Sequence, residues 1–194
     1  MAAVKYSLQD FIADMDSLLS SKPDQKRIFD KGSTYLERLI GNPEAIPAEY
    51  RRPLGRGPRP HHGTYRLHKG SNGLSLISVV WGPGDHIDPH DHHTWGMIGV
   101  MDNFLAETRF KRVDDRRKKD YARIEKDRLA VSKPGEVSLL VPDVDEIHQI
   151  DNETRKPTVE IHVYGHDLGD LERCKFDAAT GRVSVFRSGK YDNE

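Results

Sequence analysis

Residues 81–110 of the chain are WGPGDHIDPHDHHTWGMIGVMDNFLAETRF, with His90 and His92 one residue apart near the centre. Residues i and i+2 of a β-strand point to the same face of a sheet, so two imidazoles at this spacing can bind one metal ion. Pro83 and Gly84 precede the pair. The pattern predicts a strand, a tight turn, and a second strand that carries both histidines.

A third metal ligand is available far downstream, at His148 in the segment VPDVDEIHQIDN. Two histidines from one strand and one from a distant strand can meet inside a small antiparallel barrel. Three neutral imidazoles leave a divalent ion with its full charge, which favours anionic ligands, and leave three positions of a six-coordinate ion open. Ligand type by itself is compatible with zinc, copper or iron.

Two segments resemble the two motifs of the cupin superfamily: Gly84 to His92, and Pro142 to Asn152, which contains His148. The glutamate that usually completes the first motif is absent. With WGPG ahead of the histidines and Glu107-Thr108-x-Phe110 behind them, the pattern is similar to the thiol dioxygenases, the family of cysteine dioxygenase and 3-mercaptopropionate dioxygenase. The resemblance extends over roughly residues 65–164.

The resemblance implies an all-β fold, a cupin jelly-roll barrel with an N-terminal α-helical cap. It implies a single cupin domain over residues 1–194, with the helical cap and a loop in residues 1–60 and the β-barrel in residues 64–190. The implied cofactor is Fe(II), and the implied reaction oxidises a thiol to a sulfinic acid with both atoms of O2. The implied metal ligands are His90, His92 and His148.

A second group of polar residues is expected beside the metal. The segment VEIHVY places Glu160, His162 and Tyr164 on one face of a strand, because they alternate. The thiol dioxygenases carry Ser-x-His-x-Tyr here, so Glu160 stands in place of the serine. The resemblance implies that Tyr164 directs its hydroxyl at substrate or oxygen and that His162 orients it. The alternative is that Tyr164 is a barrel aromatic whose hydroxyl only needs a partner.

The residue that binds the substrate carboxylate departs from the family pattern. The family places an arginine, or a glutamine in the mercaptopropionate branch, where this chain has Leu67, and Arg66 stands one residue earlier. Arg66 is the first candidate for substrate binding, because a guanidinium can grip a carboxylate with two hydrogen bonds. Arg56 and Arg59, in a loop rich in Arg, Pro and Gly, are the alternatives.

The cysteine–tyrosine crosslink of animal-type cysteine dioxygenases is not expected in this chain. Gly96 occupies the position of the crosslinked cysteine, and the single cysteine, Cys174, lies far away in the sequence. Both departures favour a small thiol carboxylate other than cysteine, with 3-mercaptopropionate as the first candidate.

Periodicity and turn residues predict an N-terminal helical region followed by strands. The charged segment 111–127 is expected to be a solvated hairpin, and His93 is expected to point away from His92. The expected helices span residues 7–20 and about 24–39, with a short helix near 47–51. The expected strands are 65–68, 74–81, 94–100, 104–110, 129–131, 137–141, 147–151, 158–164, 172–176 and 182–187.

Composition argues against several classes of protein. The net charge of −1 favours neither nucleic acid nor an acidic membrane as a partner. One cysteine cannot form an internal disulfide and suits a reducing compartment. No apolar segment predicts a signal peptide or a membrane span, so we expect a cytoplasmic protein whose partners are a small thiol and O2.

Two other functions are compatible with three histidines on a barrel. One is a dioxygenase that cleaves a carbon–carbon bond of a diketone-like substrate, which would chelate the metal through two oxygens and would not need Tyr164. The other is a non-catalytic metal-binding cupin, against which the pairing of His162 with Tyr164 argues.

Overall fold

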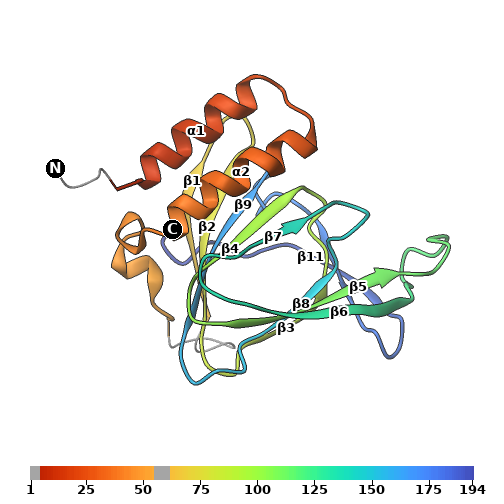
Figure 1. Ribbon diagram of the computed structural model, residues 1–194. Coiled ribbons are helices and arrows are strands. Elements are labelled where there is room, and N and C mark those ends of the chain that lie inside the picture. The colour runs from red at the N-terminus through yellow and green to blue at the C-terminus, as the bar shows by residue number, and fades with distance from the viewer. Residues whose placement is uncertain (1–4, 55–61) are drawn as a thin grey trace.

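The computed structural model describes residues 5–54 and 62–194, and it is built mainly from β-strands (Figure 1). The helical elements are α1 (Leu8–Ser20), α2 (Gln25–Ile40) and the short 3-10 helices η1 (Pro43–Ala45) and η2 (Ala48–Arg51). The strands are β1 (Gly63–Lys69), β2 (Ser75–Trp81), β3 (His86–His90), β4 (Gly96–Asp102), β5 (Leu105–Arg112), β6 (Ile124–Ser132), β7 (Val137–Leu140), β8 (His148–Asp151), β9 (Thr158–Tyr164), β10 (Arg173–Phe176) and β11 (Val183–Phe186).

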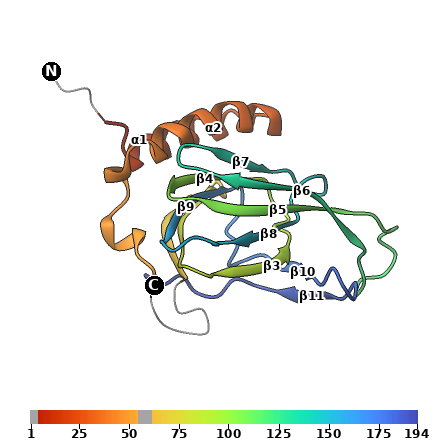
Figure 2. The same cartoon turned by 60° about the horizontal axis from the view of Figure 1, so that its bottom comes forward.

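The strands form two antiparallel sheets that face each other. One sheet has the order β1-β2-β9-β4-β7 and the other β11-β10-β3-β8-β5-β6. Figure 2 shows the helices over the first sheet and β3, β10 and β11 on the opposite side of the barrel. Every residue of β2 and β9 is buried, because one face of these strands meets the helices and the other faces the barrel interior. The expected all-β jelly-roll barrel with an N-terminal helical cap is confirmed.

The helical cap is formed as the sequence predicts. Ser7 and Asp10 form a capping box at the start of α1, and Asp24 caps α2 through the backbone N–H of Arg27. The short helix expected near residues 47–51 is the 3-10 helix Ala48–Arg51. Within the described residues, no helix is both long enough and apolar enough to span a membrane.

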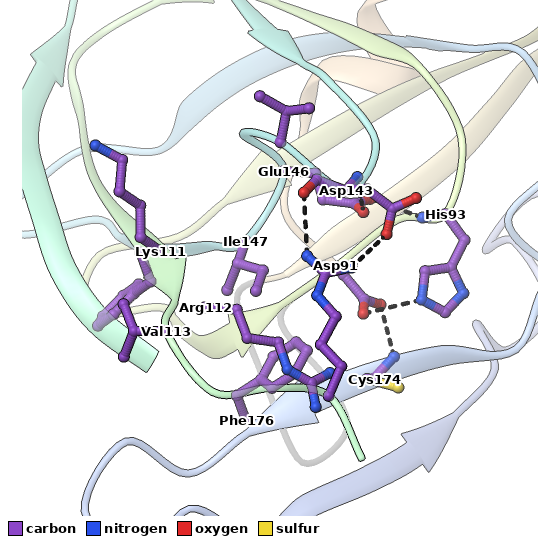
Figure 3. A pocket seen from close by; sticks show the side chains of 13 residues that line it. Asp91, His93, Lys111, Arg112, Val113, Asp143, Glu146, Ile147, Cys174 and Phe176 are labelled. Carbon is purple, nitrogen blue, oxygen red and sulfur yellow. Dashed lines mark hydrogen bonds and ion pairs between the residues drawn. The ribbon is translucent and has the colours of Figure 1, made fainter. Parts of the chain in front are cut away.

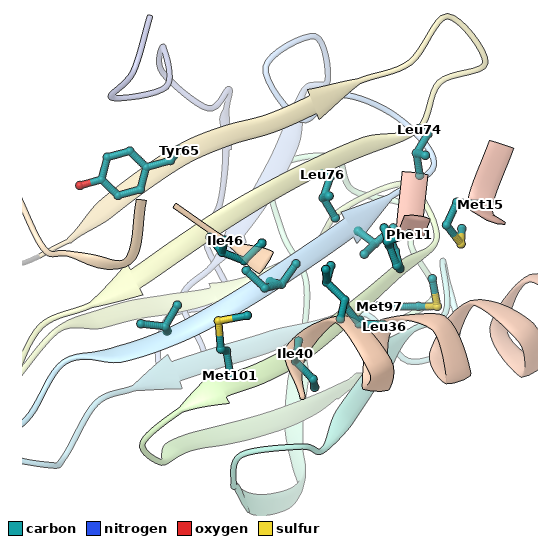
Figure 4. Close-up of a cluster of buried hydrophobic side chains, with 14 of the residues drawn as sticks. Phe11, Met15, Leu36, Ile40, Ile46, Tyr65, Leu74, Leu76, Met97 and Met101 are labelled. Carbon is teal, nitrogen blue, oxygen red and sulfur yellow. The ribbon is translucent and has the colours of Figure 1, made fainter. Parts of the chain in front are cut away.

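The cap is held by an apolar core between the helices and the first sheet (Figure 4). Phe11, Leu36 and Met97 are completely buried in it. Gly99 permits the close approach of α2 to β4, because a Cβ atom there would lie 3.0 Å from Ile40 and 3.1 Å from Leu36. The cap therefore covers the outer face of the sheet that carries β9 and leaves the barrel interior free for the site.

Two local predictions need correction. The strand that was expected to carry both histidines ends at His90, and His92 lies in the connection to β4. The strand expected at residues 129–131 is the end of β6, which begins at Ile124 and pairs with β5 along its length. The charged segment thus lies around the tip of a long β5–β6 hairpin, and most of its residues are exposed as expected.

Candidate metal centre

Three histidines from separated parts of the chain converge inside the barrel. His90 at the end of β3 pairs directly with His148 at the start of β8, and His92 follows in the next connection. The ring centroids are 4.9 Å apart for His90 and His92, 4.7 Å for His90 and His148, and 4.9 Å for His92 and His148. One ligand atom from each ring lies within 4.8 Å of the others, and all three residues are buried.

The three imidazoles are held in the form that a metal needs. Burial lowers the pKa of each ring, so all three are neutral and carry a lone pair. Nδ1 of His90 lies 2.9 Å from the carbonyl oxygen of Asp88, so Nδ1 is occupied by this contact and Nε2 is left for a metal ion. Nδ1 of His92 is buried without a hydrogen-bond partner among the described residues. This donor set and its orphaned nitrogen fit a divalent metal ion.

His148 is oriented by a buried ionic network. Its Nδ1 lies 2.6 Å from Oε1 of Glu107, which also forms an ion pair with Arg109 at 2.9 Å, while Ser138 donates to Oε2. Burial acts to raise the pKa of Glu107, but the bond to His148 and the charge of Arg109 outweigh it and lower the pKa to about 2. The carboxylate is therefore ionised, which fixes the ring of His148 and makes it a stronger ligand.

Replacing Glu107 by glutamine is expected to weaken metal binding by ~10–100-fold, because the amide keeps the shape but loses the charge behind His148. Competition between the protein and a chelator for Fe(II) or Zn²⁺ measures this affinity. Glu136→Gln, at an exposed position, is the matched control and should bind normally. Unchanged affinity in a folded Glu107→Gln protein would mean that Glu107 serves only to neutralise Arg109.

Three residues of β9 form a hydrogen-bonded chain beside the histidines. The hydroxyl of Tyr164 lies 2.7 Å from Nδ1 of His162, and Nε2 of His162 lies 3.1 Å from Oε2 of Glu160. Trp81 donates its indole N–H to the same carboxylate oxygen at 2.7 Å. The ring of Tyr164 stacks on that of His92, with centroids 5.5 Å apart. The alternation in the sequence thus places all three side chains together, next to the three histidines.

A cavity of about 280 Å³ opens over the histidines and contains an arginine that the sequence did not single out. Arg173 on β10 lines this cavity and is 5% exposed, yet it forms no ion pair with any described residue. Its Nε has no hydrogen-bond partner there, and one terminal nitrogen donates to Ser188 at 2.6 Å. A buried cation without a carboxylate is costly, so the arrangement favours an anionic ligand.

Arg66 is not among the residues that line the cavity. Its guanidinium binds Asp167 and Glu194, each at 2.8 Å, and lies over the ring of Tyr191. Because both carboxylates already neutralise it, Arg66 is not placed to bind a substrate carboxylate. The two alternatives from the sequence, Arg56 and Arg59, lie outside the described residues.

The ring of Tyr164 packs against Gly96, the residue that stands where the family has its crosslinked cysteine. A Cβ atom at Gly96 would lie 2.9 Å from two carbons of this ring, so glycine makes room for it. Cys174 lies on β10 with its side chain outside the cavity that contains Tyr164. No bond between the two residues is possible in this arrangement.

No family model matches the chain. Solved structures with a similar fold include oxalate oxidase in complex with the substrate analogue glycolate, at 16% identity and a TM-score of 0.47, over 65% of this chain and 61% of that one. The chain thus spans less than two thirds of that protein's length. A sugar phosphate isomerase of the cupin superfamily from Silicibacter pomeroyi matches at 17% identity and a TM-score of 0.43, over 64% of this chain and 74% of that chain.

An uncharacterised conserved protein with a double-stranded β-helix domain, from Klebsiella pneumoniae subsp. pneumoniae, matches at 14% identity and a TM-score of 0.42, over 72% of this chain and 93% of that chain. At these identities and TM-scores, nothing about the chemistry of the histidine site follows from these proteins.

Proposed function

We propose that the protein is a non-haem iron thiol dioxygenase that oxidises a small thiol carboxylate to its sulfinic acid. The balanced reaction is RSH + O2 → RSO2H, in which both oxygen atoms are added to sulfur. The first candidate substrate is 3-mercaptopropionate and the second is cysteine. The observation that carries the proposal is one cavity that contains three neutral histidines, the Tyr164–His162 pair and the unpaired guanidinium of Arg173.

The metal site suits a thiolate ligand. His90, His92 and His148 are neutral, so they leave the charge of a divalent ion uncompensated, and no carboxylate is among the described residues that line the cavity. Bound Fe(II) would supply coordination of the thiolate and activation of O2. The site therefore favours substrates that are anions in solution or that become anions when they bind.

The chain of residues on β9 can accept the thiol proton. The carboxylate of Glu160 only accepts hydrogen bonds, so Nε2 of His162 donates to it and Nδ1 holds a lone pair toward Tyr164. Tyr164 then donates its O–H to His162 and leaves its oxygen lone pairs free. Burial raises the pKa of Tyr164 well above its usual value, so the phenol stays protonated. A substrate thiol can pass its proton to this oxygen while the phenol proton moves to His162.

Arg173 supports the choice of a carboxylate substrate. Its side chain comes from the strand next to β3, and it reaches the cavity from the side opposite the β9 residues. A guanidinium can hold a carboxylate through two parallel hydrogen bonds and so fix the position of the thiol. A cavity of about 280 Å³ admits a molecule of a few carbon atoms.

The proposal is tested by oxygen uptake with iron-loaded protein and product identification by mass. We expect uptake with 3-mercaptopropionate or cysteine, in equal amount to the sulfinic acid formed. Mercaptosuccinate tests tolerance for a second carboxylate, and a diketone tests the alternative reaction. Uptake with the diketone and with no thiol would replace this proposal by carbon–carbon cleavage. No uptake with any of them by fully iron-loaded protein would indicate a metal-binding protein without this activity.

Replacing Tyr164 by phenylalanine is expected to lower kcat by ~100–10,000-fold, the usual range for loss of a positioned proton acceptor. Iron content should not change, since the hydroxyl is not among the metal ligands. Steady-state kinetics and metal analysis of the same sample provide the measurement. A variant that keeps the full rate, or one that loses its iron, would refute the role assigned to Tyr164.

A further inference from the structure

A second group of side chains that could bind a metal lies just beyond the end of β3, on the outer side of the barrel. His90 and His92 line the cavity inside the barrel. Asp91 and His93 line a different cavity, where they meet Cys174 of the neighbouring β10 (Figure 3). One ligand atom from each of these three outer residues lies within 4.8 Å of the others. They border a cavity of about 290 Å³ that is separate from the one over the histidine cluster.

The outer residues are oriented as metal ligands usually are. Nδ1 of His93 lies 3.0 Å from the carbonyl oxygen of Glu172, so Nε2 is the ring nitrogen that faces the other two residues. That Nε2 lies 3.0 Å from Oδ2 of Asp91, and the other oxygen of Asp91 accepts the backbone N–H of Cys174 at 2.7 Å. The two oxygens of Asp91 therefore hold His93 and Cys174 close to each other.

The backbone also holds His93 in an uncommon conformation. Its φ angle is 54°, in the left-handed region that few non-glycine residues adopt. The N–H groups of His92 and His93 both donate to one carboxylate oxygen of Glu146, at 3.0 and 2.8 Å, which stabilises this turn. Glu146 thus positions the outer imidazole and adds a negative charge beside it.

We propose that Asp91, His93 and Cys174 form a second metal site, which binds Zn²⁺. A thiolate, an imidazole and a carboxylate are ligands that zinc accepts together, and three protein ligands leave its fourth position to water from the adjoining cavity. This site differs from the histidine cluster in containing the only cysteine of the chain. The proposed thiol oxidation does not involve this second site.

The positive side chains beside the outer site are paired with carboxylates, and Lys111 binds Asp127 at 2.5 Å. Arg112 and Arg116 line the same cavity, but Arg112 is paired with Asp114 at 2.8 Å and Arg116 with Asp143 at 2.8 Å. Burial, and then the charge of Asp91, raise the pKa of Cys174 to about 11, so the thiol keeps its proton until a metal binds. Binding of Zn²⁺ forms the sulfur–zinc bond and releases that proton to solvent.

Co²⁺ is the probe for the test, because a thiolate bound to cobalt gives a charge-transfer band that imidazole and carboxylate ligands do not. Full-length protein freed of metal is titrated with Co²⁺. We expect two equivalents to bind, with the thiolate band accompanying one of them, and we expect Zn²⁺ to abolish the band. Cys174→Ser should lose the band and one equivalent while it keeps the other.

Two further variants separate the sites. His93→Ala should weaken the binding that produces the band by at least ~10-fold, since it removes a ligand. His148→Ala should retain the band while it loses the other equivalent. Binding of a single equivalent by wild-type protein without a thiolate band would overturn the proposal and leave Asp91 and His93 as an ion pair. A band that persists in His93→Ala at unchanged affinity would also overturn it.

Discussion

Iron(II) is expected to be lost, and thiol oxidation to fall to background, when His148 is replaced by alanine. His148 is one of the three proposed ligands, and the two that remain, His90 and His92, are separated by one residue in the chain. Loss of the third removes the only ligand contributed by β8. Metal content after gel filtration and oxygen uptake with 3-mercaptopropionate measure both effects.

The matched control for this variant is His86→Ala. His86 lies four residues before His90 and binds Asp151 and Asp88 on the exposed side of β3. It should keep its iron and its rate. Added metal should raise the melting temperature of the wild type and of this control but not of His148→Ala, because only a protein that binds the ion is stabilised by it. Normal iron content in folded His148→Ala would refute the proposed ligand set.

The Michaelis constant for 3-mercaptopropionate is expected to rise by ~10–150-fold when Arg173 is replaced by methionine. Hydrogen bonds to charged groups contribute ~1.5–3 kcal/mol each, and ~1.4 kcal/mol corresponds to a factor of ten. Arg173 contacts the carboxylate rather than the reacting sulfur in this proposal, so kcat should change less than the Michaelis constant. Steady-state oxygen uptake measures both constants.

Stability provides a second measurement on the Arg173 variant. Because the guanidinium is buried without an ion pair among the described residues, methionine should leave the melting temperature unchanged or raise it. Arg187→Met is the control at the cavity rim, where the arginine is exposed and paired with Glu172. Arg66→Met tests the residue that the sequence favoured. A larger rise for Arg66→Met than for Arg173→Met would move the carboxylate site to Arg66.

Much of the fold and part of the site could be predicted from local patterns. The first helix was expected because its apolar residues repeat with helical spacing and Ser7 and Asp10 have the spacing of a capping box, and the second because Gly41 and Pro43 can end it. The spacing of His90 and His92 indicated a shared ligand position even though β3 ends at His90. The alternation that leads to Tyr164 was enough to place it beside His162. Each of these depends on residues that are near one another in the chain.

The remaining residues of the site could not be found this way. Glu107 lay within a segment that the family resemblance included, but its contact with His148 depends on the pairing of β5 with β8. Arg173 was missed because nothing around it in the sequence resembles a binding motif, and Arg66 was chosen because it lies one residue before Leu67, where the family carries its arginine. The pairing of Arg66 with Asp167 joins residues 101 positions apart.

The chain's local patterns thus determined the helices, most of the strands and the pairs His90–His92 and His162–Tyr164, because strand alternation and turn residues act over a few positions. The family resemblance added the barrel and the third histidine, His148. Only the tertiary structure decided how β10 pairs with β3, with Lys175 opposite His90. This pairing determines which cation enters the cavity and brings Cys174 to Asp91 on the opposite face. Sheet register joins distant segments, and a shift of one residue would exchange the sides of Arg173 and Cys174.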